Sequence, residues 1–401
     1  MKNEMNEDVQ VDVVADYLSG RRVALAVSGG IAAIETPKLA RQIRRFGGEV
    51  SIYTTRDALK FVGETALEWG CGREVTSELS GLAEHICRED IVLVAPATLN
   101  TINKIFAGIA DNPATTLVAS ALGKGVPVYL APTMHESLYK NPFLQHNLDA
   151  AQEYGIKIIP PRIGEGKAKM PRLDTIVAEV SRELSIDPIK GRKLLITGGP
   201  TPVKIDDVRR ITNRFSGKTA IAIAKEAYHR GADVTLLLGK CGSKAPEYIH
   251  TLYHDDYPQY YQNVFSQLEM GCDAGIFSAA VADYAPETVF SGKIKSDGAL
   301  KSIPLVQTRK VIRDVRERFP GLYMATFKFE QGVTQEELLV IARSRIADGY
   351  QLVVANRAED MVNGHKAYIV GKEEVIEEAA SKEDIGRKLI SIICDGLGKR
   401  V

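Results

Sequence analysis

The sequence lacks the features that would direct the protein to a membrane or a nucleic acid. Its 401 residues contain no apolar run near the roughly 18 residues that a membrane-spanning helix needs. Basic and acidic residues balance at 51 each, so no excess positive charge favours nucleic acid or an anionic lipid surface. Residues 1–20 are acidic and polar, unlike a secretory signal peptide. These absences predict a cytoplasmic protein that binds neither membrane nor nucleic acid.

Cysteines are few and have no common spacing. No C-x-x-C pair occurs, and the separations match neither a disulfide framework nor a metal site among Cys71, Cys87, Cys241, Cys272 and Cys394. Such thiols are typical of the reducing cytoplasm. The spacing identifies no metal ligands, so those stay unknown.

A complete P-loop is also missing. The stretch SGKT at 216–219 ends like the phosphate-binding motif G-x-x-x-x-G-K-[ST], but Thr212 stands where that motif needs its first glycine. The residues alone predict instead a polar loop leading into a helix over 218–230. Ser216 or Asn213 would then lie near the helix N-cap.

Both halves of the chain open with a strand, a glycine-rich turn, a helix and a second strand. In the first half these fall within 21–55, and in the second within 191–239. Further continuous apolar runs, typical of parallel strands covered on both faces, occur at 91–97, 126–132, 274–280, 322–329 and 350–356. This pattern predicts an α/β protein with two doubly wound, Rossmann-like domains. They would join near 185–191, giving domains 1–186 and 187–401.

Ligands in such folds bind at the carboxyl ends of the strands, where this chain has polar segments. Gly29 and Gly30 open a helix, so their N–H groups suit an anion such as phosphate, although a plain turn would look the same. Thr98 and Asn100 suit a planar heterocycle or a carboxylate, and also a helix cap. His85 precedes the strand at 91–97 and is either a structural residue or an acid–base group.

In the second half, Lys293 and Lys295 follow Asp283 in a loop rich in glycine and serine. An acid and a lysine near a strand end suit a metal–nucleotide phosphate site. Solvated surface charges would give the same pattern.

Together, over about 21–395 and in the same order, these motifs resemble the family of bifunctional coenzyme A biosynthesis proteins, in its archaeal-type branch. In that family a phosphopantothenoylcysteine decarboxylase is fused to a phosphopantothenate–cysteine ligase. The resemblance implies an N-terminal flavodoxin-like domain that binds FMN and a C-terminal nucleotide-binding ligase domain.

The first half resembles the flavin-containing cysteine decarboxylases. SGGIAAIETPKLARQIRRFGGEV at 28–50 is similar to their flavin-binding opening, EHI at 84–86 to their catalytic-histidine motif, and the stretch 94–112 to their PASANT motif. The segment 131–148 takes the place of P-x-M-N-x-x-M. The resemblance implies that His85 is catalytic and that FMN is bound by Ser28, Gly29, Gly30, Thr54, Pro96, Thr98 and Asn100. It implies that phosphopantothenoylcysteine is bound by Met134, His135, Lys167 and Lys169.

Two positions differ from the bacterial members of that family. Those members have asparagine where this chain has His135, and they have a cysteine in a clamp where this chain has RIGEGKAKMPR, 162–172. That cysteine is thought to protonate the last intermediate. Here Lys167 or Lys169, or a thiol such as Cys71 or Cys87, would take its place.

The second half is similar to the ligase at three stretches, 196–224, 278–295 and 324–330. The resemblance implies that Asn213 stabilises an acyl-nucleotide intermediate and that Lys293 is catalytic. It implies CTP binding by Ser216, Gly217, Lys218, Ser278, Ala279, Asp283, Lys293 and Phe327.

The implied function is CTP- and Mg²⁺-dependent ligation of cysteine to 4′-phosphopantothenate through an acyl-cytidylate. FMN-dependent decarboxylation of the product to 4′-phosphopantetheine would follow. The family also implies a homo-oligomer in which the flavin domain forms trimers and the ligase domain forms dimers. A dodecamer would contain both arrangements.

Three other functions fit parts of the sequence. A ligase with a flavin-binding regulatory domain would need no clamp cysteine. An NAD(P)-dependent dehydrogenase would need G-x-G-x-x-G and an acid after its second strand, and neither 49–57 nor 233–240 supplies that pattern. A flavin prenyltransferase would leave 191–401 unexplained.

Overall fold

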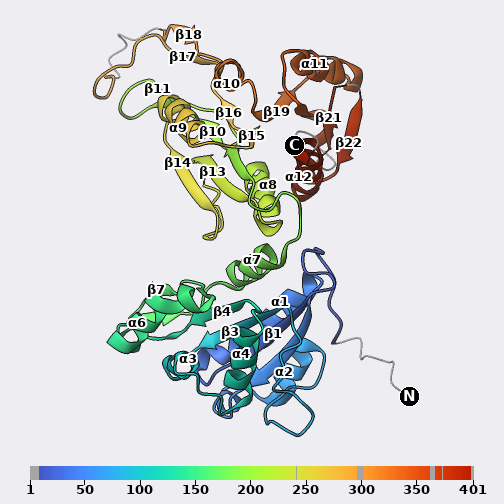
Figure 1. The fold of residues 1–401 in the computed structure, drawn as a ribbon. Helices are drawn as coiled ribbons and strands as arrows, with labels where there is room; N and C mark the ends of the chain where they lie inside the picture. The colour runs from blue at the N-terminus through green and yellow to red at the C-terminus, as the bar shows by residue number, and fades with distance from the viewer. Residues whose placement is uncertain (1–8, 241, 296–301, 362–365, 373, 399–401) are drawn as a thin grey trace. The chain divides into compact units, whose positions relative to one another are not determined.

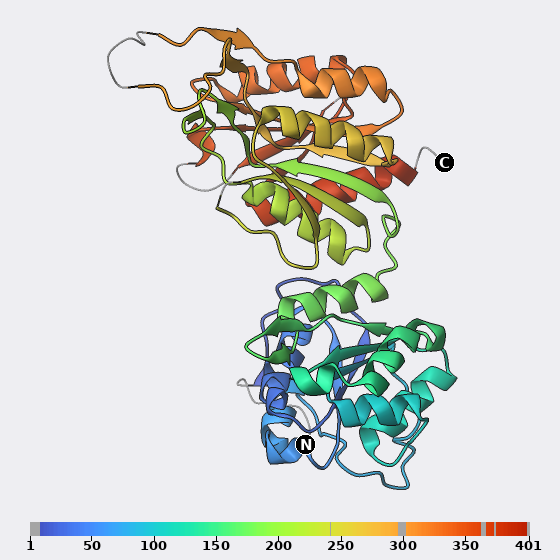
Figure 2. The same ribbon diagram turned by 90° about the vertical axis from the view of Figure 1, so that its left-hand side faces the viewer.

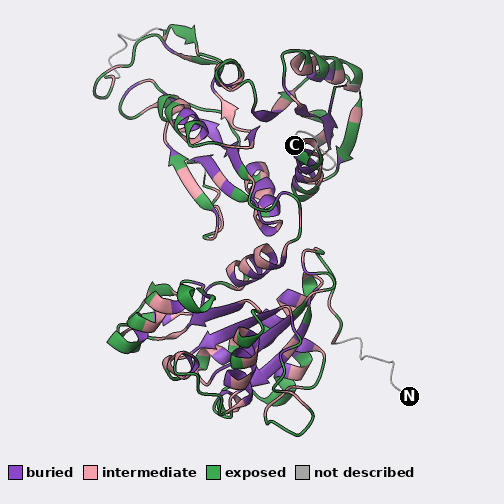
Figure 3. Cartoon of the chain, in the orientation of Figure 1, coloured by how far each residue is buried: buried purple, intermediate pink, exposed green. Residues whose placement is uncertain are grey.

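The computed structural model describes residues 9–240, 242–295, 302–361, 366–372 and 374–398 (Figure 1). Cys241 and the ends of the chain lie outside this description. The chain divides into two compact units, Met1–Ser185 and Ile186–Val401. In both, buried strands form the centre (Figure 3). Within the described part, every helix is too short or too polar to cross a membrane.

The N-terminal unit is built on a parallel sheet with the order β2-β1-β3-β4-β6. Its strands are β1 (Arg22–Val27), β2 (Glu49–Thr54), β3 (Ile91–Ala97), β4 (Val128–Pro132) and β6 (Ile156–Ile158). Counted along the chain this is the order 2-1-3-4-5 of the flavodoxin-like fold, and the order reverses between β1 and β3. The predicted fold class of this unit is confirmed.

Helices cover both faces of this sheet (Figure 1). Because side chains alternate along a strand, Val23 and Leu25 of β1 pack on one face and Ala24 and Ala26 on the other. The first face is covered by α1 (Thr36–Arg45), α2 (Glu64–Cys71) and α7 (Leu173–Leu184). The second is covered by α3 (Leu99–Phe106), α4 (Pro113–Gly123) and α6 (Pro142–Ala150). Short turns of helix are η2 (Ile31–Glu35), η3 (Ala58–Lys60), α5 (Glu136–Tyr139) and η4 (Ala151–Tyr154).

The segment 162–172 forms a hairpin beside this sheet. Its strands β7 (Arg162–Gly164) and β8 (Lys167–Lys169) pair antiparallel, and β8 also pairs with β5 (Met134–His135). The turn uses Glu165 and Gly166, both with positive φ. The hairpin thus joins the two segments in which the sequence predicts substrate-binding residues.

The C-terminal unit is built on a sheet with the order β14-β13-β9-β15-β19-β20-β21-β22. Its strands are β9 (Lys193–Gly198), β13 (Asp233–Gly239), β14 (His250–His254), β15 (Ala274–Phe277), β19 (Tyr323–Glu330), β20 (Leu352–Arg357), β21 (Ala367–Val370) and β22 (Val375–Ala379). The first six in chain order are parallel and follow the 3-2-1-4-5-6 order of a Rossmann fold. Strands β21 and β22 extend one edge in antiparallel pairing.

Helices again form a layer on each face of this sheet, as Figure 2 shows. Leu194 and Ile196 of β9 pack against α8 (Lys218–His229) and α12 (Lys382–Gly398). Leu195 packs on the opposite face with α9 (Tyr257–Glu269) and α10 (Val311–Arg318). The remaining helices are α11 (Gln335–Ala347), which covers β20 and β21, and the short η5 (Glu359–Met361).

The helix after the first glycine-rich turn begins with the 3₁₀ turn η2 before α1, because Pro37 is tolerated only in the first turn of an α-helix. Helix α8 begins at Lys218, as predicted, and Ser216 lies next to its N-cap. The N-cap itself is Gly217, whose φ of 73° turns the chain directly before the helix.

Replacing Gly198 by alanine should destabilise the C-terminal unit. A Cβ at this position would lie 2.2 Å from the Cβ of Ala220 in α8, so the strand and the helix would have to separate. Overpacking of this kind costs about 1–3 kcal/mol in the free energy of unfolding. Urea unfolding followed by circular dichroism measures it. Gly321→Ala is the control, because an added Cβ meets open space there. Equal stability of the two variants would contradict the close packing.

Candidate functional site

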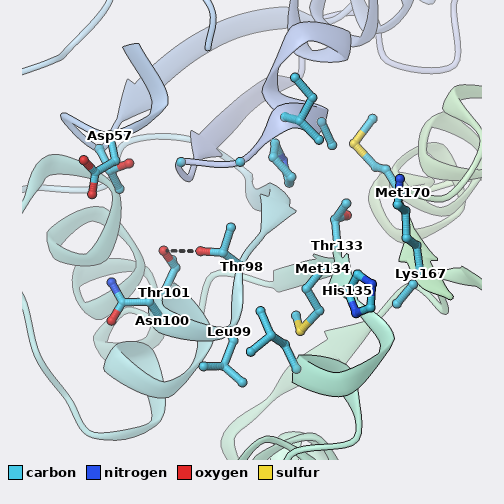
Figure 4. A pocket seen from close by; sticks show the side chains of 18 of the residues that line it. Asp57, Thr98, Leu99, Asn100, Thr101, Thr133, Met134, His135, Lys167 and Met170 are labelled. Atoms are coloured by element: carbon cyan, nitrogen blue, oxygen red, sulfur yellow. Dashed lines mark hydrogen bonds between the residues drawn. The ribbon is translucent and has the colours of Figure 1, made fainter. Parts of the chain in front are cut away.

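A cavity of about 830 Å³ lies at the carboxyl ends of β1, β3 and β4 in the N-terminal unit (Figure 4). It lies where the strand order reverses, which is the ligand site of doubly wound folds, and its volume is typical of small-molecule sites. Nine predicted site residues line it: Gly29, Gly30, Pro96, Thr98, Asn100, Met134, His135, Lys167 and Lys169.

Two predicted flavin-binding residues, Ser28 and Thr54, lie behind the wall of the cavity. Both are fully buried and neither lines it. The Ser28 hydroxyl donates to the carbonyl of Pro96 at 2.7 Å and accepts from the N–H of Thr98 at 2.9 Å. Ser28 therefore ties the end of β1 to the end of β3 and positions the residues that do line the cavity.

The floor of the cavity depends on the absence of side chains at Gly29 and Gly30. A Cβ at Gly29 would lie 2.5 Å from the Cβ of Asp57, and one at Gly30 would lie 3.3 Å from Cγ2 of Thr98. The N-terminus of α3 faces the same space and presents N–H groups that helices leave unpaired. Among the described residues, the buried Thr55 hydroxyl of this wall has no hydrogen-bond partner. These groups suit an anionic group such as a phosphate.

Basic side chains outnumber acidic ones around the cavity. They are Arg56, Lys104, Arg162, Lys167 and Lys169, against Glu35, Asp57 and Asp111. Hydrogen bonds from Lys60 and Lys104, at 2.5 Å each, hold the pKa values of Asp57 and Asp111 below their usual range. Both carboxylates are thus ionised near neutral pH, and the remaining positive charge suits anionic ligands.

His135 and Lys167 are neighbours on the hairpin side of the cavity. They are cross-strand partners in the pairing of β5 with β8, and Figure 4 shows the two side chains next to each other. The His135 Nδ1 atom lies 3.3 Å from the Ser137 hydroxyl. Lys169 forms an ion pair with Glu165 at 2.7 Å.

His85 does not reach the cavity of its own chain. It is exposed in the loop that precedes β3 and is absent from the cavity lining. Three large apolar side chains of the same loop are also exposed: Leu79, Leu82, which is 84% exposed, and Ile86. Exposed apolar side chains gathered on one loop are typical of a surface that another chain covers.

In the C-terminal unit, the predicted nucleotide site lies where the strand order reverses between β9 and β15. Here β10 (Pro200–Thr201) pairs with β16 (Ala280–Val281). The Asn213 amide nitrogen donates to the carbonyls of Ala280 at 3.0 Å and Val281 at 3.4 Å. The fold therefore brings Asn213 to the strand ends, although it lies far from them in the sequence.

Three other predicted residues gather at the same strand ends. Ser278 donates from its hydroxyl to the Thr197 carbonyl at 2.6 Å, and the Ala279 N–H donates to the Thr197 hydroxyl at 3.4 Å. Phe277 and Thr326 are register partners in β15 and β19, so Phe327 lies next to Ser278 along this edge. Ser216, Gly217 and Lys218 form the entry to α8. Nearby, Phe215 and Phe329 make an edge-to-face contact at 5.6 Å.

Asp206, a residue that the sequence did not single out, connects the segment of Lys293 to this site. It is 1% exposed and lies between β11 (Val203–Lys204) and β12 (Arg210–Ile211). Burial opposes its ionisation, but N–H donors from Arg209, Ile294 and Val208 outweigh burial and lower the pKa of its carboxyl. The bond to Ile294 fixes the backbone beside Lys293, whose own side chain is exposed.

Lys310 was also missed. It lies at the start of α10 and forms an ion pair with Asp283 at 2.5 Å. Asp283 leads into β17 (Tyr284–Pro286), which pairs with β18 (Leu305–Gln307). In the sequence, the signal that could have pointed to Lys310 was its position directly before a helix and at the edge of a strand. Among the described residues, no group of three or more His, Cys, Asp or Glu side chains is arranged to hold a metal ion.

Known proteins match the two units in turn. The family described as Flavoprotein matches residues 14–185, and the family described as DNA/pantothenate metabolism flavoprotein C-terminal domain matches residues 189–397. The fold and the cavity at the β1–β3 switch point therefore define a flavoprotein, fused to a nucleotide-type Rossmann unit. The match to the flavoprotein family confirms the prediction that the cofactor is a flavin.

Two archaeal proteins are similar along most of their length. The coenzyme A biosynthesis bifunctional protein CoaBC of Thermococcus kodakarensis is 38% identical over 349 residues, which are 84% of this chain and 86% of the relative. The protein of the same name from Methanocaldococcus jannaschii is 33% identical over 383 residues, 93% of each. The chain belongs to the family of coenzyme A biosynthesis bifunctional proteins, as the motifs predict.

A solved structure is also similar. The crystal structure of the DNA/pantothenate metabolism flavoprotein from Streptococcus pneumoniae covers 51% of this chain and 100% of its own, with 24% identity and a TM-score of 0.48.

Replacing Gly29 by alanine should reduce flavin retention. The added Cβ would collide with the Cβ and the carbonyl carbon of Asp57, so the floor of the cavity would have to shift. We expect at least a tenfold weaker flavin affinity, equivalent to about 1.4 kcal/mol, measured by flavin fluorescence during titration. Gly63→Ala is the control, because nothing lies within 4 Å of a Cβ there. Wild-type affinity in Gly29→Ala would show that the glycine turn is not part of the flavin site.

Proposed function

We propose that the protein catalyses two consecutive steps of coenzyme A biosynthesis. The C-terminal unit joins cysteine to 4′-phosphopantothenate, and the N-terminal unit decarboxylates the product to 4′-phosphopantetheine. The observation that carries this proposal is a cavity of about 830 Å³ with a glycine turn at its floor and a basic rim, at a flavodoxin-type switch point, in a member of this family. We assign the decarboxylase to residues 1–186 and the ligase to residues 187–401.

In the ligase step, the carboxylate of 4′-phosphopantothenate attacks the α-phosphate of CTP and pyrophosphate leaves. The amine of cysteine then attacks the acyl carbon and CMP leaves. Asn213, anchored to the Ala280 and Val281 carbonyls, holds the acyl-cytidylate at the strand ends. Lys293 offsets phosphate charge. Mg²⁺ accompanies the triphosphate, which suits a cation that is commonly bound through substrate phosphates.

The remaining nucleotide contacts follow from the same geometry. Ser278, Ala279 and Phe327 lie along the edge where the base and ribose bind, and Ser216, Gly217 and Lys218 lie at the entry to α8. Asp283 forms an ion pair with Lys310, and we expect the two charges to act together on the nucleotide.

In the decarboxylation step, the bound cofactor is FMN rather than FAD. Bound FMN would supply the electron acceptor for the cysteinyl carbon that bears sulfur, and this would make loss of CO₂ from the neighbouring carbon favourable. Gly29, Gly30 and Thr98 would hold its phosphate, and Pro96 and Asn100 would contact it. Met134, His135, Lys167 and Lys169 bind the substrate from the hairpin side of the cavity.

A neighbouring copy of the chain supplies His85 to this cavity. The loop of His85 is exposed, carries apolar side chains and ends outside the cavity of its own chain. A homo-oligomer with a trimeric flavin domain and a dimeric ligase domain would bring the two together. We place the assembly in the cytoplasm, in agreement with the four cysteines that the structure describes, all of which are free thiols.

A product assay tests the proposed function. Purified protein is incubated with 4′-phosphopantothenate, cysteine, Mg²⁺ and either CTP or ATP, and products are identified by mass spectrometry. Formation of 4′-phosphopantetheine with CTP is the expected result. Asn213→Asp should lower ligation by at least about tenfold, because the acid repels the acyl-cytidylate phosphate. Accumulation of 4′-phosphopantothenoylcysteine would mean a ligase with a regulatory flavin domain, and absence of both products would reject the proposal.

Mixed oligomers test the position of His85. His85→Asn should abolish CO₂ release, and Gly29→Ala should do so by loss of flavin. Subunits of the two variants, dissociated and reassembled together, should regain part of the activity, because one cavity then has both an intact floor and an intact His85. If the mixture stays inactive while reassembled wild-type protein is active, His85 acts within its own chain or not at all.

A further inference from the structure

Decarboxylation consumes one proton for each CO₂ released. The carbon that loses CO₂ exchanges a C–C bond for a C–H bond, so the net change is R–CO₂⁻ + H⁺ → R–H + CO₂. Oxidation and later reduction of the neighbouring carbon cancel in this balance, which rests on the decarboxylation proposed above. A group on the wall of the cavity has to deliver that proton to the carbon.

Thiols do not supply it. Cys71 lies in the core of the N-terminal unit, with its Sγ 3.1 Å from the Arg73 carbonyl, and Cys87 is buried beside Glu89. Neither lines the cavity, and burial raises the pKa of both thiols. Cys71 and Cys87, two of the predicted alternatives, are therefore excluded as proton donors.

Acidic side chains on the wall are also unsuitable. Asp57 and Asp111 are each held ionised by a lysine, and an ionised carboxylate has no proton to give. The carboxylate of Glu35 lies 3.6 Å from the ammonium of Lys38, a further ion pair.

Most of the cations are unsuitable as well. Arg56 and Arg162 carry guanidinium groups, which do not lose a proton in proteins. The ammonium groups of Lys104 and Lys169 are engaged in ion pairs with Asp111 and Glu165. Of the ionisable side chains that this chain itself contributes to the described wall, two remain, Lys167 and His135. His85, which the proposed function brings into the cavity from a neighbouring copy, acts before CO₂ leaves.

We propose that His135 is the acid that protonates the carbon from which CO₂ has left. The imidazolium Nε2–H bond breaks, the new C–H bond forms with the electron pair that CO₂ leaves behind, and the imidazole is left neutral. Histidine gives and regains a proton near neutral pH, whereas lysine holds its proton several pH units higher. His135 is exposed at the rim, so solvent can return the proton before the next turnover.

The surroundings of His135 suit this role. The contact of Nδ1 with the Ser137 hydroxyl orients the ring and leaves Nε2 for the substrate. The turn at Gly166 passes near Nε2 of His135 but has no side chain to block it. Even an added Cβ at Gly166 would lie 4.0 Å from Nε2. The charged groups around the ring are Glu136 on its own segment and Glu165, Lys167, Lys169 and Arg162 on the hairpin.

The test measures CO₂ and 4′-phosphopantetheine separately in flavin-loaded, full-length protein given 4′-phosphopantothenoylcysteine. Wild-type protein should form them in equal amounts. In His135→Gln, CO₂ should still be released while 4′-phosphopantetheine per CO₂ falls by about 10²-fold, the usual contribution of a general acid. A decarboxylated product with two hydrogens fewer should accumulate, up to one equivalent per bound flavin because the two electrons stay on the flavin, and it is detected by its mass.

Lys140→Gln is the matched control, because it removes an exposed lysine of the same segment that does not line the cavity. It should keep the two products equal. Equal products in His135→Gln, or no CO₂ release from it at all, would overturn the proposal, since the residue would then be dispensable or only bind substrate. Wild-type protein that releases no CO₂ would instead reject the proposed function.

A binding measurement gives an independent readout. The serine analogue of the substrate has no thiol to oxidise, so it binds without reacting. Calorimetry in buffers of different ionisation enthalpy reports proton uptake on binding. The pH is set about one and a half units above the ordinary histidine pKa of about 6.5, so that the free imidazole is neutral. Wild-type protein and Lys140→Gln should take up protons as the imidazolium forms beside the carboxylate, and His135→Gln should not. Equal uptake in all three would overturn the proposal.

Discussion

The structure depends on one topological constraint, the reversal of strand order in a parallel sheet whose two faces are covered. Helices that leave neighbouring strands for opposite faces cannot close over the same strand end, so a crevice stays open there. The order reverses between β1 and β3 in the first unit and between β9 and β15 in the second. Polar side chains that would be costly inside the sheet can lie at these two points, and most of the proposed site residues do.

Each crevice is kept in shape by hydrogen bonds and close packing behind the ligand. In the first unit, the Ser28 hydroxyl joins β1 to β3, and Gly29 lets the backbone pass against Asp57. In the second, Asn213 reaches two carbonyls after β15, and the buried Asp206 carboxylate joins a hairpin to the segment of Lys293. The buried groups among these, Ser28 and Asp206, are stable because each has several partners, and they fix the loops that face the ligand.

The two units use similar folds for different chemistry. The first keeps an open cavity with a basic rim, which suits a resident aromatic cofactor and an anionic substrate together. The second presents single side chains along a strand edge, which suits a nucleotide that enters and leaves in each cycle. In both, function resides in the residues placed at the strand ends and not in the fold itself.

The sequence by itself determined the α/β class, the division into two units, the family and most strand positions, because continuous apolar runs and glycine turns are local signals. It predicted Gly29, Thr98 and Asn213 as site residues, and these lie at the strand ends. It did not single out Asp206 or Lys310, whose partners Ile294 and Asp283 lie 88 and 27 residues away. Only the tertiary structure decided that Ser28 and Thr54 lie behind the cavity, that His85 lies outside it, and that Cys71 and Cys87 are buried elsewhere. Those outcomes depend on which strands become neighbours and which way side chains face, and both are set by packing across the whole unit rather than by local sequence.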